Sequence, residues 1–165
     1  MNQTSLQSMN KFLLSLLLAA LLPLSAAFGQ GWKYIFGGSS TDNAESIVQM
    51  ADHGFVVAGY SQSFGGNGDF DIYATRFDVD GRLVWTKTYN QGFTERGYQV
   101  VTDEEGNLLI VGEVKRTQTS SFDAYLMKIA PNGDFLWSKN YNTPGESGAQ
   151  SITPTTDGGY LLVGY

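Results

Sequence analysis

The chain lacks cysteine altogether and contains one histidine and four prolines among its 165 residues. Without cysteine it has no disulfides, no Cys-based metal cluster and no site for a bacterial lipid anchor, so the core alone must hold the fold. The single histidine, His53, excludes His-Glu-x-x-His motifs, and no phosphate-binding glycine loop is present. The sequence therefore predicts no catalytic residue, no metal site and no cofactor.

Basic residues are also scarce. Ten Lys and Arg residues stand against 16 Asp and Glu residues, which gives a net charge of −6, and no Lys/Arg run interrupts this balance. An acidic chain is repelled by phosphate backbones and by anionic membrane surfaces. We therefore expect no nucleic-acid partner.

Long hydrophobic runs are absent except for Phe12 to Leu24. Lys11 precedes this run and the small residues 25–27 follow it, which is the three-part pattern of a secretory signal peptide. The run is too short to span a bilayer comfortably, so no membrane span is expected. Residues 1–29 are predicted to be the signal peptide of a soluble protein that is secreted to the cell surface, the medium or the periplasm.

A tandem repeat occupies the rest of the chain. Asp71 to Trp85, DIYATRFDVDGRLVW, returns as Asp123 to Trp137, DAYLMKIAPNGDFLW. Both copies have a Tyr two places after the Asp, a basic residue five places after it and a Gly four places before the Trp. The period is 52 or 53 residues at independent landmarks. These landmarks are Trp32, Trp85 and Trp137, and Gly59, Gly112 and Gly164.

Each repeat consists of short β-type segments separated by turn residues. Asp80-Gly81 and Asn132-Gly133 lie between such segments and readily take the positive φ angles of a hairpin turn. The second segment of each unit is continuously apolar, which predicts a strand buried on both faces. The expected strands are 45–50, 55–61, 71–77, 83–89, 98–102, 108–114, 123–129, 135–141, 150–153 and 160–165.

A unit of four antiparallel strands with a period near 50 is typical of a β-propeller blade. The sequence thus predicts an all-β fold over residues 30–165. The units are unit one at 42–89, unit two at 95–141 and an incomplete unit three at 147–165. Trp32 to Phe36 matches the fourth strand of a unit and is expected to be an orphan first strand, 32–36, that completes a final blade. About two and a half blades are present, whereas a ring needs about four, so a fragment of a larger protein is expected.

A family resemblance lies in the segments DHGFVVAGYSQS, EGNLLIVGE and DGGYLLVGY. The first two are followed by an Asp-x-Tyr strand and then by DGRLVW or NGDFLW. They resemble the β-propeller repeats of secreted bacterial proteins. Such repeats are common in Bacteroidota and often precede a carboxyl-terminal type IX secretion sorting domain. The resemblance covers residues 32–165; it implies a propeller fold and export, and it implies no particular ligand.

Residues with catalytic or metal-binding potential have simpler structural interpretations. Asp71 and Asp123 recur once per unit, which favours capping of a strand entry over catalysis. His53 lies at a hairpin turn, where the other units have glycine. Gly65 to Asp71 approaches a calcium nonapeptide, but Phe70 stands where that motif needs an Asp. The recurring Trp and Tyr residues favour packing between units over sugar stacking.

The sequence favours a secreted, non-catalytic binding or scaffolding module, whose ligand is unknown and whose partner is a protein or a glycan. The loops 62–70 and 115–122 differ between units and are the expected places for partner contacts. One alternative is a lectin-like propeller assembled from short chains. Another is the amino-terminal part of a propeller enzyme, glycan-active or quinoprotein. The sequence indicates no ligand-binding residue and no oligomeric state.

Export predicts a new amino terminus. We expect signal peptidase to cleave after Gly29, so that mass spectrometry of the exported protein finds a chain that begins at Gln30. Cleavage after Ala27 is the alternative site. An exported protein that still carries residues 12–24 contradicts the signal-peptide prediction.

Overall fold

The computed structural model describes residues 33–65 and 68–165, and these residues form β-strands, turns and loops. Residues Tyr34–Tyr165 form one compact unit. The predicted signal peptide, 1–29, lies outside the described residues. Within the described part, no helix has the length and apolar character needed to cross a membrane.

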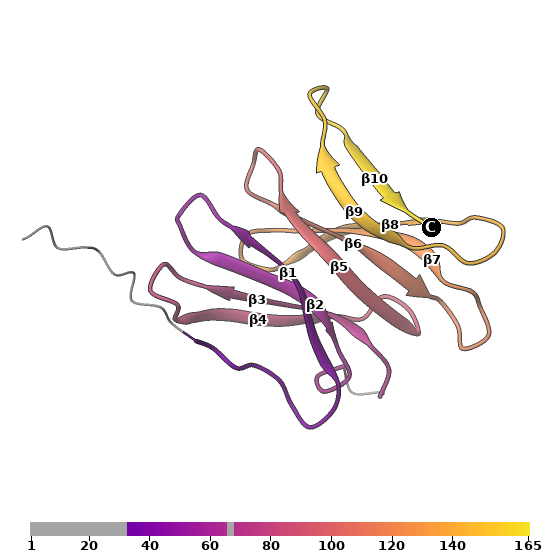
Figure 1. Ribbon diagram of the computed structural model, residues 1–165, viewed down its shortest axis with the longest axis horizontal. Helices are drawn as coiled ribbons and strands as arrows, with labels where there is room; N and C mark the ends of the chain where they lie inside the picture. Colours follow the sequence, from indigo (N-terminus) through magenta and orange to yellow (C-terminus); the bar gives the residue numbers. More distant parts are fainter. Residues whose placement is uncertain (1–32, 66–67) are drawn as a thin grey trace, which may run out of the picture. The chain divides into compact units, whose positions relative to one another are not determined.

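Three antiparallel sheets make up the unit Tyr34–Tyr165 (Figure 1). In each sheet, strands that are consecutive in the sequence are hydrogen-bonded neighbours, and none of the sheets closes on itself. The first sheet contains β1 (Asp42–Gln49), β2 (Phe55–Ser61), β3 (Asp71–Phe77) and β4 (Leu83–Tyr89). The second contains β5 (Thr94–Thr102), β6 (Leu108–Lys115), β7 (Asp123–Ile129) and β8 (Phe135–Tyr141), and the third contains β9 (Ala149–Pro154) and β10 (Tyr160–Gly164). The all-β class and the four-stranded antiparallel sheets are thereby confirmed.

The first strand of each sheet is longer than predicted because it contains a β-bulge. The pairing register shifts between Ala44 and Ser46 in β1, between Gly97 and Gln99 in β5, and at the matching place in β9. Each bulge interrupts the period-two alternation on which a sequence-based boundary depends. Consequently β5 begins four residues before the predicted strand, at Thr94 instead of Tyr98.

The bulge explains the glycine that marks each repeat. Gly59, Gly112 and Gly164 pair with the residue just before the bulge. At each glycine, an added Cβ atom would overlap the backbone carbonyl oxygen of the residue just before the glycine's pairing partner. Only glycine allows the two backbones to approach so closely. The regular spacing of these glycines therefore follows from the close approach of two backbones opposite the bulge, which occurs in every sheet.

Apolar side chains fill the space between consecutive sheets. Strand β5 packs against β1 and β2, and β9 packs against β5 and β6, so the first strands lie next to one another. Polar contacts cross the same boundary, because the hydroxyl group of Tyr89 donates to the Gly133 carbonyl oxygen at 2.7 Å. The cluster between the first and second sheets contains Met50, Val56, Ala58, Ile72, Ala74, Tyr89, Val100, Leu108, Ile110, Val114, Tyr125, Met127 and Ile129. The cluster between the second and third sheets contains Leu109, Val111, Leu126, Ala149 and Ile152.

The connections fall into two groups at opposite ends of the strands. Tight hairpin turns form one end, where Gly81, Gly106, Gly133, Gly158 and His53 have positive φ angles between 65° and 81°. This places His53 at a turn, as predicted. We call this the turn end, and it comprises residues 50–54, 78–82, 103–107, 130–134 and 155–159. The opposite, loop end comprises residues 62–65, 68–70, 90–93, 116–122 and 142–148.

Two predictions need correction. Residues 33–36 form no strand, because no neighbouring strand offers them a ladder of hydrogen bonds; instead Phe36 stacks on Tyr73 with ring centroids 5.4 Å apart. Burial of the second strands also differs among the sheets. Strand β6 is buried along nearly its whole length, but β10 is exposed along one face because no sheet covers it.

Substitution of the bulge-facing glycine should be far more harmful than substitution of a turn glycine. We expect Gly112→Ala to lower the free energy of unfolding by about 3 kcal/mol, since the Cβ atom overlaps backbone that cannot move aside. Gly106→Ala meets open space and strains only a positive φ angle, which costs about 1 kcal/mol. Urea denaturation measures both, and equal losses would contradict the close-approach explanation.

Candidate functional site

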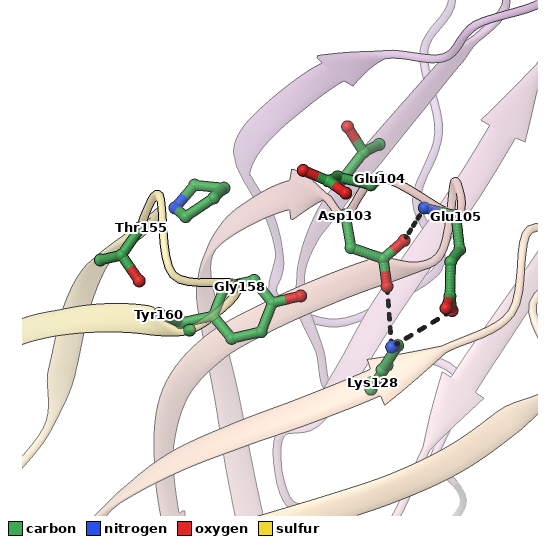
Figure 2. Close-up of a pocket in the computed structure, with 10 residues that line it drawn as sticks. Asp103, Glu104, Glu105, Lys128, Thr155, Gly158 and Tyr160 are labelled. Carbon is green, nitrogen blue, oxygen red and sulfur yellow. Dashed lines mark hydrogen bonds and ion pairs between the residues drawn. The ribbon is translucent and has the colours of Figure 1, made fainter.

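A cleft of about 480 Å³ lies at the turn end between the second and third sheets (Figure 2). Lys128 of β7 points into it, and its Nζ atom lies 2.7 Å from Asp103 Oδ2 and 3.9 Å from Glu105 Oε2. The hydrogen bond that Lys128 donates to Asp103 raises the pKa of Lys128. Burial raises the pKa of Asp103, but this hydrogen bond and those from Asn107 outweigh burial and lower it. Thr155 and Tyr160 line the opposite wall. The charged groups thus neutralise one another.

The same construction recurs between the first and second sheets. There a cleft of about 320 Å³ is lined by Arg76, and Arg76 forms an ion pair with Asp52 of the first turn. Arg76 precedes Lys128 by one repeat, and Asp52 precedes Glu105 by one repeat. A feature found at both sheet junctions is expected to be part of the repeated structure. We therefore interpret both clefts as consequences of the fold and not as the binding site of a particular ligand.

A different cluster, at the loop end, occurs once in the described residues. Its centre is Arg96 of β5, whose guanidinium group forms a 2.8 Å ion pair with the buried Glu113 of β6. The same guanidinium lies over the rings of Phe70 and Phe122, 4.9 and 5.1 Å from their centroids, and 5.9 Å from that of Tyr60. We call Tyr60, Phe70, Arg96, Tyr98, Glu113 and Phe122 the arginine cluster.

The arginine cluster lies where the two variable loops meet. Phe70 ends the loop 62–70, Phe122 ends the loop 115–122, and Arg96 contacts both rings. The structure therefore brings the two loops predicted to contact partners to a single arginine. Sequence reasoning missed this residue, although a signal was present: one repeat earlier Arg96 is replaced by Asn43, and one repeat later by Gly148.

The electrostatics of the arginine cluster suit recognition better than proton transfer. Burial opposes the charge of Arg96, but the hydrogen bond and the charge of Glu113 raise its pKa overall. Burial and Glu113 raise the pKa of Tyr98 well above its ordinary value. A hydrogen bond to Glu113 raises the pKa of Tyr165 to about 12. Neither phenol can therefore act as an acid or base near neutral pH.

The repeated aspartates differ from one another and from the predicted role. Asp71 is buried, and among the described residues no backbone N–H donates to its carboxylate, so it does not act as the predicted cap. Burial raises its pKa, and the Asn90 side chain interacts with this carboxylate and partly offsets the effect. Asp123, one repeat later, lies 3.8 Å from the Nε atom of Arg116 instead. Position 71 thus carries a desolvated acid, whereas position 123 carries an ion pair.

A second buried acid lies close to Asp71. The backbone N–H of Glu95 donates to the Phe70 carbonyl oxygen at 2.6 Å, and the Glu95 side chain is fully buried. Burial raises the pKa of Glu95 to about 7, helped by the charge of Asp71 and only partly offset by the Gln91 N–H. Within the described residues, no three His, Cys, Asp or Glu side chains gather to hold a metal ion.

The aromatic residues mostly pack as predicted. Tyr89 is buried between the first two sheets, and Trp85 packs against the same cluster while its indole N–H donates to the Pro131 carbonyl oxygen at 3.2 Å. Trp137 is exposed, since the third sheet has no β-strand beside it at this place. Trp32 lies outside the described residues.

Comparison with known proteins assigns neither a family nor a function to the chain. No protein-family model matches the chain, and no curated protein matches it. The functional argument therefore depends on the geometry and on the sequence pattern.

The buried Glu95 predicts an unusual pH dependence of stability. The folded state holds a proton on Glu95 up to about pH 7, whereas the unfolded chain releases it near pH 4.5, so the free energy of unfolding should fall as the pH rises between these values. The loss is about 3 kcal/mol, because each pKa unit corresponds to about 1.4 kcal/mol. Asp71 contributes in the same direction.

Chemical denaturation from pH 5 to pH 8 tests this prediction. Glu95→Gln should flatten most of the decline, since glutamine stays neutral and keeps an acceptor for the Gln91 N–H. The control Glu104→Gln, at an exposed turn position, should retain the wild-type slope. An equally steep decline in Glu95→Gln would show that another group is responsible.

Proposed function

We propose that the chain is a secreted, non-catalytic binding or scaffolding module built as part of a β-propeller. The repeat of 52 or 53 residues supports the propeller, as do the antiparallel order of each four-stranded sheet and the packing of first strand against first strand. Identical register and an identical bulge in each sheet indicate one structural unit used several times.

Export is supported by the amino terminus. The apolar run at 12–24 with its flanking residues has the composition of a signal peptide, and a chain without cysteine needs no disulfide chemistry to fold outside the cell. The repeat motifs resemble those of secreted bacterial propellers of the Bacteroidota type, some of which use the type IX secretion pathway, and this resemblance supports export.

The geometry of the arginine cluster is the observation that best supports a binding function. Arg and Tyr are the residues most often found at the energetic centres of interfaces, and here they are held on strands between two loops of unit-specific sequence. The ion pair with Glu113 fixes the guanidinium, so little side-chain entropy is lost when a partner binds. The partner of this surface is a protein or a glycan.

A non-catalytic role agrees with the chemistry of the described residues. The lysine in the 480 Å³ cleft is neutralised by Asp103, and Tyr98 of the arginine cluster holds its proton at neutral pH. Glu95 has a pKa suited to acid–base work, but its side chain is fully buried. A general acid must reach its substrate.

A binding screen tests the proposal. The exported protein is applied to a glycan array and, immobilised, to the extracellular proteins of the organism that makes it. The variant Arg96→Gln/Glu113→Gln removes both charges together and leaves no unpaired buried charge. We expect it to weaken binding about tenfold or more, as is usual at the centre of an interface.

Two further variants keep the screen decisive. Arg116→Ala changes an exposed residue at the start of the loop 116–122 without touching the core and should also weaken binding. Arg82→Ala changes an exposed residue at the turn end and should bind as the wild type does. Binding that only Arg82→Ala reduces would move the site to the turn end, and no binding in either screen would contradict the proposed function.

A further inference from the structure

Two buried acids meet where the first and second sheets join at the loop end. Asp71 and Glu95 are 1% and 0% exposed. The backbone N–H of Glu95 donates to the Phe70 carbonyl oxygen at 2.6 Å, so the start of β5 lies beside the start of β3. The charge of Asp71 raises the pKa of Glu95, which indicates that the two carboxylates lie close enough to repel each other.

The two carboxylates have few polar partners. Glu95 Oε1 accepts the Gln91 N–H at 2.7 Å, but Glu95 Oε2 has no hydrogen-bond partner among the described residues. Within the same part of the chain, the Asn90 side chain is the partner of the Asp71 carboxylate. None of the ion pairs between described residues includes either acid. Burying two negative charges together is costly unless a cation balances them.

The junction between the second and third sheets has no such pair. There the equivalent of Asp71 is Asp123, whose Oδ2 atom lies 3.8 Å from Arg116 Nε. The equivalent of Glu95 is the neutral Ser147, whose hydroxyl oxygen accepts a backbone N–H at 3.1 Å. The repeated fold therefore does not require two acids at this place, and the acid pair is specific to the first junction.

The donor atoms of the pair suit a calcium ion. Carboxylate oxygens and the amide oxygen of asparagine are the kinds of ligand that Ca²⁺ prefers. Zinc sites usually contain cysteine or histidine, but the chain has no cysteine and its single histidine lies at the turn end. Asp69 adds a third negative charge nearby, which raises the pKa of both Asp71 and Glu95. This concentration of negative charge attracts a cation.

The pair has a solvent side. Asn90, which interacts with Asp71, is itself exposed. On another side the backbone lies directly against the carboxylate, because a Cβ atom added at Gly65 would lie 1.2 Å from Asp71 Oδ2. Glycine at this position therefore leaves the space that the carboxylate occupies.

We propose that Asp71 and Glu95 bind a calcium ion, with Asn90 on the solvent side of the site. The observation that carries the proposal is the burial of two neighbouring carboxylates without a balancing Lys or Arg at one junction and not at the next. The ion joins the start of β3 to the start of β5, and thus the first sheet to the second. With two carboxylate ligands we expect a Kd of about 10⁻⁴ M, as in extracellular calcium-binding modules.

Isothermal titration calorimetry is the first measurement. The exported protein is freed of metal with EDTA, dialysed at pH 7.5 and titrated with CaCl₂. We expect a single calcium site in the wild type, and Asp71→Asn and Glu95→Gln should each weaken it about tenfold or more. Asp123→Asn is the matched control, because it changes the equivalent acid one repeat later, which has Arg116 beside it. It should bind calcium as the wild type does.

Thermal unfolding separates loss of the site from loss of the fold. In EDTA, Asp71→Asn and Glu95→Gln should melt at or above the temperature of the wild type, because each removes one of two repelling buried charges. With calcium at about 100 times Kd, the melting temperature of the wild type and of Asp123→Asn should rise by about 5 °C or more. The melting temperatures of the two ligand variants should rise much less.

Several results would overturn the inference. A wild type that calcium neither binds nor stabilises would show that the two acids share a proton instead. Calcium binding that Asp71→Asn and Glu95→Gln leave unchanged, or that Asp123→Asn weakens equally, would place the ion elsewhere. A ligand variant that melts below the wild type in EDTA would contradict the repulsion, and equal affinity for MgCl₂ would contradict a calcium site. None of these measurements involves a partner of the arginine cluster, so either proposal can fail without the other.

Discussion

Burial of apolar side chains between consecutive sheets is the interaction on which this structure depends. A single antiparallel sheet has two faces and can cover neither of them by itself. Here the second sheet buries one face against the first sheet and the other against the third, and Ile110 and Leu109, adjacent in β6, point into different clusters. Stability therefore grows by interfaces between neighbours, as expected of a repeat protein.

The β-bulge adapts the sheets to this packing. It lies in the first strand of each sheet, where the neighbouring sheets come closest together. A bulge increases the local twist of a strand. Glycine opposite the bulge then allows the second strand to follow it without a steric clash, as at Gly112. A local backbone irregularity and the contact between sheets are thus parts of one arrangement.

The period of the sequence predicted the strands better than it predicted the sites. The limits of β2, β3, β4, β7 and β8 agree with the prediction, because turn residues such as Asp80-Gly81 mark them clearly. The first strands are longer than predicted, because the bulge in each interrupts the alternation of apolar and polar residues. The arginine cluster was missed because Arg96 and Glu113 are far apart in the sequence and meet only after β5 pairs with β6. Burial of Asp71 was missed because a recurring polar residue suggests a surface role.

The polar contacts between sheets rely heavily on backbone acceptors. Arg76 donates to the carbonyl oxygen of Pro131, and Tyr89 donates to that of Gly133. A carbonyl oxygen is supplied by every residue, so the neighbouring unit need not conserve a particular side chain at these places. Whole units can therefore be duplicated, lost or exchanged during evolution while the junctions are kept. The sequence of each unit remains free to diverge at the loop end, where a new specificity would arise.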